Sequence, residues 1–376
     1  MILLLHHRYR EPGGEERAVE DLRWLIGAEL DEDVEVLERD SSGLSATAAG
    51  LGLLAGGVHP GEVAAAVRRT GARVVHAHNL TPTFGWRALA AAREAGARVV
   101  LHLHNYRLVC AVGTCFTRGQ DCTRCHGRNT WPGVRLNCRG GSRAESAAYG
   151  AGLALWQGRL AGAADAVVVP SQFALGRLRE LGAPLDGAHV IPSVQRAFAE
   201  RSRAGEGRFA LVAARLTPEK GVADAIAACR SAGRPLLVAG DGPQRAELEA
   251  LAAGGDVRFT GRLGADELAA LRAEAAVAIV PSRYAEILPL AALEAMAAGL
   301  PTVAARSGGL AEAVPEEGLY APGDVTALAE RMTALYADAA AGERALATAR
   351  ARWAPAVIAA ELRALYDRNS VPATVL

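Results

Sequence analysis

The stretch from Pro281 to Val314 constrains the fold of this chain more than any other part of the sequence. The apolar run that precedes it, residues 276–280, is typical of a buried strand. Pro289 suits the first turn of a helix, and the Gly-Leu-Pro run at 299–301 ends that helix before a second strand begins. The stretch therefore predicts a strand–helix–strand unit of an α/β sheet.

Two carboxylates belong to this stretch: Glu286 precedes the predicted helix, and Glu294 lies inside it. A strand that leads into a helix N-terminus presents free backbone N–H groups and the positive end of the helix dipole, which together favour an anion. Carboxylates do not bind phosphate, but they accept hydrogen bonds from hydroxyl groups. The pattern indicates a ligand with an anionic middle and polyhydroxylated ends, and a sugar nucleotide has that form.

A longer pattern surrounds these carboxylates: E-x7-E, then E-A-M-A-x-G-x-P, and then G-G-x-x-E, all within residues 286–312. This string resembles the donor site of retaining glycosyltransferases of family 4. The resemblance covers nearly the whole chain and implies the GT-B fold, in which two Rossmann-like, doubly wound α/β domains face each other across a cleft. The chain departs from the pattern at Ile287, where one branch of the family has an asparagine and many other members have an aromatic residue.

Length and composition agree with a two-domain globular protein, since the chain has 376 residues, of which 51% are hydrophobic and 22% charged. We expect a first domain over 1–196, a second over 197–352, and a C-terminal helix over 353–376 that, as in GT-B proteins, crosses back to the first domain.

Lys plus Arg and Asp plus Glu number 41 each, so the net charge gives no reason to expect nucleic acid as a partner. Because no run is long enough to span a membrane and the N-terminus reads as a strand, we expect a cytoplasmic protein with at most peripheral membrane contact.

In the first domain, the candidate site residues follow predicted strands. Gly13 and Gly14 lie between a strand and a helix, where adjacent glycines let the backbone approach a ligand. His104 ends a predicted strand at 98–104, and ligands of doubly wound sheets bind at such ends. The family has a glycine pair and a histidine at these places, which implies that they contact the donor. His76 and His78 end the preceding strand and are as well explained by packing.

An insertion at residues 105–142 lacks hydrophobic periodicity and contains five of the six cysteines. The spacing Cys122-x2-Cys125 is typical of a zinc knuckle, and two further thiolates would complete a structural zinc site. The insertion resembles a cysteine-rich insertion found in the N-terminal domain of one branch of the family. That branch usually has an aliphatic residue at the position of Cys115, so the predicted ligands are Cys110, Cys122, Cys125 and Cys138. Redox chemistry, an iron–sulfur cluster and simple reduced thiols remain alternatives. We expect the insertion to shape the acceptor side of the cleft.

In the second domain, Arg215 and Lys220 flank a predicted helix start, and two cations so placed can neutralise a diphosphate from two directions. The family's Arg-x4-Lys-Gly motif implies that role here. The resemblance further implies that the backbone at Arg262 and Leu263 contacts the nucleotide base. It also implies that the backbone amides of Leu290 and Ala291, the two residues after Pro289, contact the diphosphate.

The resemblance thus implies a retaining glycosyltransferase that moves a sugar from a UDP- or GDP-sugar to a hydroxyl of a glycan, lipid-linked or small-molecule acceptor. It assigns Glu286 to the transferred sugar and Glu294 to the ribose. It also implies that no catalytic metal is needed, since in GT-B enzymes cations and a helix N-terminus stabilise the leaving diphosphate. The alternatives are a sugar-nucleotide epimerase of the same fold and a non-catalytic sugar-nucleotide binder or scaffold.

Overall fold

The computed structural model describes residues 1–9, 13–139 and 142–367. The described chain forms two compact units: the first contains residues 1–115, 122–194 and 355–367, and the second contains 116–121 and 195–354. The division after residue 194 lies close to the predicted boundary at 196. The insertion differs from the prediction, because its residues 116–121 group with the second unit and not with the first.

The first unit is a parallel sheet of six strands in the order β2-β1-β3-β4-β7-β8. These strands are β1 Ile2–Arg8, β2 Val34–Asp40, β3 Val74–Ala77, β4 Arg98–His102, β7 Ala166–Val169 and β8 His189–Val190. Its helices are α1 Gly14–Leu25, the π-helix η1 Ile26–Leu30, α2 Ala46–Ala55, α3 Pro60–Thr70, α4 Gly85–Glu94, α5 Trp131–Arg135, α6 Arg143–Gly162, α7 Gln172–Glu180 and α15 Pro355–Asp367.

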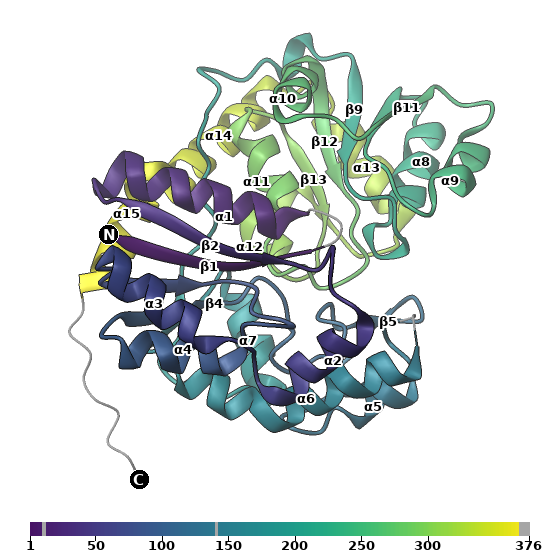
Figure 1. Ribbon diagram of the computed structural model, residues 1–376. Coiled ribbons are helices and arrows are strands. Elements are labelled where there is room, and N and C mark those ends of the chain that lie inside the picture. The colour runs from purple at the N-terminus through teal and green to yellow at the C-terminus, as the bar shows by residue number, and fades with distance from the viewer. Residues whose placement is uncertain (10–12, 140–141, 368–376) are drawn as a thin grey trace. The chain divides into compact units, whose positions relative to one another are not determined.

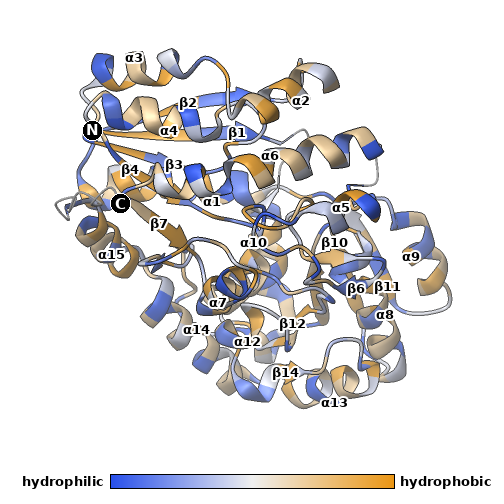
Figure 2. Ribbon diagram, turned by 90° about the horizontal axis from the view of Figure 1, so that it is seen from below, coloured by the Kyte–Doolittle hydropathy of each residue, from blue (hydrophilic) through white to orange (hydrophobic). Residues whose placement is uncertain are grey.

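Helices cover both faces of this sheet. Successive side chains of a strand point to opposite faces, so a strand that is apolar throughout must be covered on both sides. Ile2 and Leu4 of β1 belong to one buried cluster with α1 and α15. Figure 1 shows α1 and α15 on one side of β1, and α3 and α4 on the other. Figure 2 shows the hydrophobic colour of β7 and α15, both of which contribute to this cluster.

The second unit repeats the architecture with the strand order β11-β10-β9-β12-β13-β14. Its strands are β9 Phe209–Ala213, β10 Leu236–Ala239, β11 Val257–Gly261, β12 Ala275–Val280, β13 Thr302–Ala305 and β14 Leu319–Tyr320, and the insertion adds the hairpin β5 Phe116–Thr117 and β6 Gln120–Asp121. Its helices are the 3-10 turns η2 Ala204–Glu206, η3 Pro218–Lys220 and η4 Glu316–Gly318, and α8 Val222–Ser231, α9 Arg245–Ala252, α10 Ala265–Glu274, α11 Leu290–Ala297, α12 Leu310–Ala313, α13 Val325–Leu335 and α14 Ala339–Trp353.

The strand–helix–strand unit predicted around residues 281–314 is β12-α11-β13, and all six residues of β12 are buried. The predicted α/β class with two Rossmann-like parallel sheets is therefore confirmed. One boundary differs: we placed Trp353 on the last helix, but it ends α14 and is buried in the core of the second unit. Pro355 begins α15, because a proline fits a first helical turn but interrupts a helix interior.

Strand order also fixes where each sheet offers a ligand site. In a doubly wound sheet, the loops diverge at the point where the strand order reverses, and ligands bind there at the carboxyl ends of the strands. That point lies between β1 and β3 in the first unit and between β9 and β12 in the second. No helix among the residues that the structure describes has the length and hydrophobicity to cross a membrane.

Candidate active site

The loops after β9 and β12 bring two predicted site residues into contact. Lys220 ends the turn η3 after β9, and Glu286 lies in the irregular segment after β12. The Lys220 Nζ lies 2.7 Å from the Glu286 Oε1. The sequence assigned these residues separately, to the diphosphate and to the sugar, and the structure makes them one ion pair at the reversal point of the sheet.

Two neighbours of Glu286 complete this cluster, and the sequence analysis missed both. The Tyr284 hydroxyl donates a hydrogen bond to the Glu286 Oε2 at 3.0 Å, and the Ser282 hydroxyl donates to Oε1. Residues 282, 284 and 286 lie in one short irregular segment, in which the Glu286 amide donates a hydrogen bond to the Tyr284 carbonyl at 2.9 Å. The available signal was only that both polar residues lie within four positions of Glu286. We call Ser282, Tyr284, Glu286 and Lys220 the donor cluster.

The donor cluster contains an ion pair, and its Ser282 and Glu286 are buried while Lys220 and Tyr284 are half-buried. Glu286 is 5% exposed, so its carboxylate requires the partners that surround it. Burial disfavours the Lys220 cation, but attraction to Glu286 and Tyr284 outweighs that cost and raises the pKa of Lys220. Burial, and then the Glu286 charge, raise the pKa of Tyr284. Lys220 is therefore charged and Tyr284 is a hydrogen-bond donor at neutral pH.

Glycines hold the backbone of the donor cluster in place. A Cβ on Gly308 would lie 2.1 Å from the Glu286 carbonyl oxygen, and Gly308 has a φ of +59°, which favours glycine. The Gly309 amide donates a hydrogen bond to the same oxygen at 2.7 Å. On the other side, a Cβ on Gly221 would lie 2.1 Å from the Pro281 carbonyl oxygen. These close contacts explain why a glycine, Gly221, follows Lys220, and why Gly308 lies in the loop after β13.

The N-terminus of α11 follows the donor cluster directly along the chain. Leu290 and Ala291 are its first two residues, with Pro289 at the N-cap. The first amides of a helix have no acceptor inside the helix, so they are available to an anion. Arg215, by contrast, is a solvent-exposed side chain whose Nη2 lies 3.9 Å from the Glu219 Oε1.

The other predicted donor residues lie elsewhere in the second unit. Glu294 on α11 forms an ion pair with Arg272 of α10, and Arg272 is 8% exposed. No sequence pattern indicated Arg272. Arg262 and Leu263 follow β11, where Arg262 is exposed and Leu263 packs against a buried cluster. Arg283, also missed, pairs with the buried Asp224, its Nε lying 2.8 Å from the Asp224 Oδ2.

In the first unit, His104 follows β4, and its Nε2 lies 2.8 Å from the Nδ1 of His78. Burial, and then neighbouring histidines, lower the pKa of His104 to about 3, so the ring is neutral at pH 7. Gly13 is exposed and caps α1, where its amide donates to the Glu16 Oε2 at 2.7 Å, and Gly14 begins that helix. Residues 10–12 of the predicted glycine loop lie outside the described residues.

A polar network near His104 was also missed. The Tyr9 hydroxyl donates to the Glu15 Oε2 at 2.8 Å and accepts from the Arg107 Nη1 at 2.9 Å. The amide nitrogen of Asn105 lies 3.3 Å from the same hydroxyl oxygen. Burial raises the pKa of Glu15 despite its polar partners. These groups follow β1 and β4, and they form a hydrogen-bonding surface of the first unit.

The cysteines of the insertion, four of which were predicted to bind zinc, all lie among the described residues. A hydrogen bond from Cys115 lowers the pKa of Cys110 to about 6, whereas burial and the nearby Cys110 raise the pKa of Cys125 to about 11. The amide of Cys122 donates to the Cys115 carbonyl at 2.7 Å. Among the described residues, no three cysteine sulfurs lie within ligand distance of one another. The prediction of zinc at Cys110, Cys122, Cys125 and Cys138 therefore finds no support here.

Both units match known protein-family models. Residues 13–193 match the glycosyl transferase 4-like domain, and residues 207–338 match glycosyl transferases group 1. Among curated proteins, a sulfoquinovosyl transferase of Arabidopsis thaliana is 44% identical over 105 residues, which is 26% of this chain and 20% of that protein. A glycogen synthase of Mycobacterium tuberculosis is 42% identical over 166 residues, which is 41% of this chain and 40% of that protein. The matches thus span less than half the length of these relatives.

Solved structures establish the fold over nearly the full chain. A sucrose-phosphate synthase from Thermosynechococcus elongatus superposes with a TM-score of 0.69 and 21% identity, covering 97% of this chain and 98% of that one. HepE of Anabaena in complex with UDP gives a TM-score of 0.64 and 18% identity over the same shares. The GT-B architecture expected from the sequence is confirmed by these likenesses.

Proposed function

We propose that this chain, which carries glycosyl transferase domains in both units of a GT-B fold, transfers a sugar from a nucleoside diphosphate sugar to a hydroxyl acceptor. The observation that carries the proposal is the donor cluster at the reversal point of the second sheet, followed directly by the N-terminus of α11. A cation, a carboxylate and free helix amides in one place match a ligand that combines phosphates with hydroxyl groups.

In this proposal, the donor's diphosphate binds the first amides of α11 and the ammonium of Lys220. Lys220 keeps its charge because Glu286 and Tyr284 stabilise the cation. A fixed cation and helix dipole stabilise the negative charge that grows on the diphosphate as the glycosidic bond breaks. Arg215 supplies a second cation from its exposed position.

Glu286 is assigned to hydroxyl groups of the transferred sugar. Its two oxygens are held by Lys220, Ser282 and Tyr284, so the orientation of the carboxylate is fixed before the donor arrives. Preorganisation of this kind lowers the cost of ordering groups when a ligand binds. Glu294 is assigned to the ribose, and its ion pair with Arg272 fixes its position on α11 in the same way.

We further propose that the reaction retains the anomeric configuration, with the acceptor attacking from the side of the departing diphosphate. A diphosphate oxygen would take the acceptor proton, so the proposal assigns no carboxylate nucleophile. The neutral ring of His104 and the glycines Gly13 and Gly14 are assigned to donor contacts, as the resemblance implies. A UDP-sugar is the first donor to test, because HepE was solved with UDP and with UDP-glucose.

Thermal unfolding of the purified chain with UDP-glucose, GDP-mannose and their free diphosphates tests donor binding. A ligand at 100 times its Kd stabilises the folded state by about 2.7 kcal/mol. We expect one base to stabilise the wild type and Arg258→Met, whose side chain is 81% exposed, but not Lys220→Met. Equal stabilisation of all three proteins, or of none by any nucleotide, would contradict the proposed site.

A further inference from the structure

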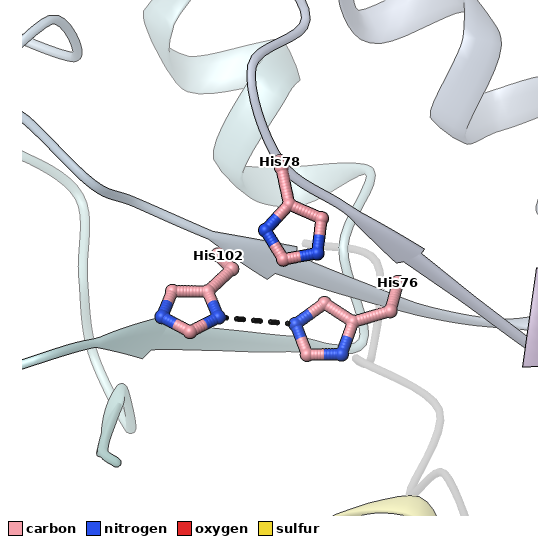
Figure 3. A group of neighbouring side chains, drawn as sticks. All are labelled: His76, His78 and His102. Atoms are coloured by element: carbon pink, nitrogen blue, oxygen red, sulfur yellow. Dashed lines mark hydrogen bonds between the residues drawn. The ribbon is translucent and has the colours of Figure 1, made fainter. Parts of the chain in front are cut away.

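Three buried histidines of the first unit lie within reach of one metal ion. His76 belongs to β3, His78 follows that strand, and His102 ends the neighbouring β4. They are 0%, 3% and 8% exposed. One ring nitrogen of each lies within 4.8 Å of those of the other two, and Figure 3 shows the three rings grouped side by side. We call these residues the histidine triad.

One pair of nitrogens in the histidine triad already has the spacing of metal ligands, and binding through all three requires the rings, whose nitrogens lie within 4.8 Å of one another, to close around the ion. The Nε2 of His76 lies 3.3 Å from the Nδ1 of His102. Two nitrogen ligands about 2.0–2.1 Å from a tetrahedral metal ion are also about 3.3 Å apart. The Nε2 of His78 is buried and has no hydrogen-bond partner within the described part of the chain. A metal ion would give this nitrogen the partner that burial otherwise denies it.

Partners on the opposite ring nitrogens fix the orientation of two of the three rings. The Nδ1 of His76 lies 2.7 Å from the Tyr366 hydroxyl on α15, and the Nδ1 of His78 lies 2.8 Å from the Nε2 of His104. Metal-binding histidines commonly use their second nitrogen in this way, which sets the tautomer and the direction of the ligand atom. The triad therefore has supporting contacts as well as ligands.

We propose that the histidine triad binds one divalent transition-metal ion of the Zn²⁺ type, through one imidazole nitrogen of each residue. Neutral imidazoles suit Zn²⁺ and its neighbours in the first transition series, and three such ligands leave a fourth coordination position for water or another group. The ion would join β3 to β4, and His104 contacts one of its ligands, His78. This site is separate from the donor cluster and from the cysteines, and it does not rest on the proposed transfer reaction.

Cobalt(II) titration of the full chain, after metal removal with a chelator, tests the proposal. We expect one equivalent of Co²⁺ to bind with visible d–d absorption, no sulfur-to-cobalt charge transfer, and displacement by Zn²⁺. His78→Gln and His102→Gln should abolish the signal, and Tyr366→Phe should weaken binding by about 10–100-fold, the effect of losing a supporting hydrogen bond. His59→Asn is the matched control, since His59 is exposed and asparagine tolerates its left-handed backbone.

A Cys110→Ser/Cys125→Ser variant separates this site from the cysteines of the insertion, and it should keep the cobalt spectrum. The proposal fails if the wild type binds no Co²⁺, or if the cysteine variant loses the signal while His78→Gln keeps it. Equal Co²⁺ binding by wild type, His102→Gln and Tyr366→Phe also overturns it. Circular dichroism of each variant identifies any that fails to fold, and the remaining histidine and tyrosine variants then decide.

Discussion

The two units place different chemistry at comparable points of two similar sheets. In the first unit, the ends of β3 and β4 carry histidines, and burial lowers the pKa of His76, His78 and His102 well below the usual range. In the second unit, the segments after β9 and β12 carry charged pairs: Lys220 with Glu286, and Arg283 with Asp224. A buried imidazole avoids the cost of a charge by losing its proton, whereas each buried carboxylate here lies against a cation.

This difference separates what each centre can bind. A centre built from fixed charges recognises a charged, hydroxylated ligand and responds strongly when one partner is removed. A centre built from neutral imidazoles offers lone pairs and weak hydrogen bonds, which suit a metal ion. The fold alone therefore does not decide the chemistry of a strand end, and the residue types placed there do.

The largest effect is expected from Lys220→Met, which removes the cation and leaves Glu286 buried with two hydroxyl partners. We expect the unfolding free energy to fall by about 3–5 kcal/mol and turnover to fall by about 100- to 1,000-fold. Urea unfolding and a nucleoside diphosphate release assay measure the two effects. The double variant Lys220→Met/Glu286→Gln should regain stability without regaining activity. If it regains both, the ion pair is only structural.

The next effect concerns the glycine that supports the donor cluster. Gly308→Ala would place a Cβ 2.1 Å from the Glu286 carbonyl oxygen, so the segment must shift, and nucleotide binding should be lost. Gly323→Ala is the matched control, because Gly323 also has a positive φ but no atom within 4 Å of the added Cβ. The strain common to both is about 1–3 kcal/mol. Equal loss of stability and of binding in the two variants would show that the close contact is unimportant.

A third prediction concerns the first unit and pH. Burial, and then His6, lower the pKa of His7 to about 4 from its usual value of 6.5, so the unfolded chain binds this proton more readily than the folded one. The contribution of His7 is fully present above pH 6.5 and is lost as the pH falls to about 4. The loss is about 3 kcal/mol. His7→Gln should lose less stability over this range, as measured by urea unfolding at each pH.

The control for this prediction is internal, because the other buried histidines are present in both proteins and their acid sensitivity cancels in the comparison. The His7 ring has two neutral partners, the hydroxyls of Thr83 and Ser41, at 3.0 Å and 2.8 Å. Glutamine retains the capacity to bond both. Parallel pH profiles for the two proteins would refute the assignment to His7.

The smallest effect is expected at Glu294. If its carboxylate binds the ribose, removing the ribose hydroxyls should cost about 1–3 kcal/mol of binding in the wild type and almost nothing in Glu294→Gln. Calorimetry of both proteins with UDP and with 2′,3′-dideoxy-UDP gives the four binding free energies of this double-mutant-type cycle. If the losses from the mutation and from removing the hydroxyls simply add, Glu294 does not contact the ribose. Arg272→Lys, which keeps the charge of the partner, should change the cycle less than Glu294→Gln does.

Sequence reasoning was strongest where the pattern is local. The β12-α11-β13 unit followed from an apolar run, a proline and a Gly-Leu-Pro stop, and it lies where these signals placed it. Ser282 and Tyr284 were recoverable by the same means, since they lie within four positions of Glu286 along the chain. The cysteines show the opposite case: the Cys-x2-Cys spacing is a local signal, but the hairpin at 116–121 groups with the other unit, and no spacing rule foretells that.

What the sequence by itself determined is the α/β class, the two sheets and the identity of the motif residues, because propensity and periodicity act over a few neighbours along the chain. Tertiary structure decided which of those residues meet. Lys220 and Glu286 are 66 positions apart, and His76 and Tyr366 are 290 apart. Such pairs form only when strand order brings distant loops to one edge of a sheet, or returns the last helix to the first unit, and that order is a property of the whole folded chain.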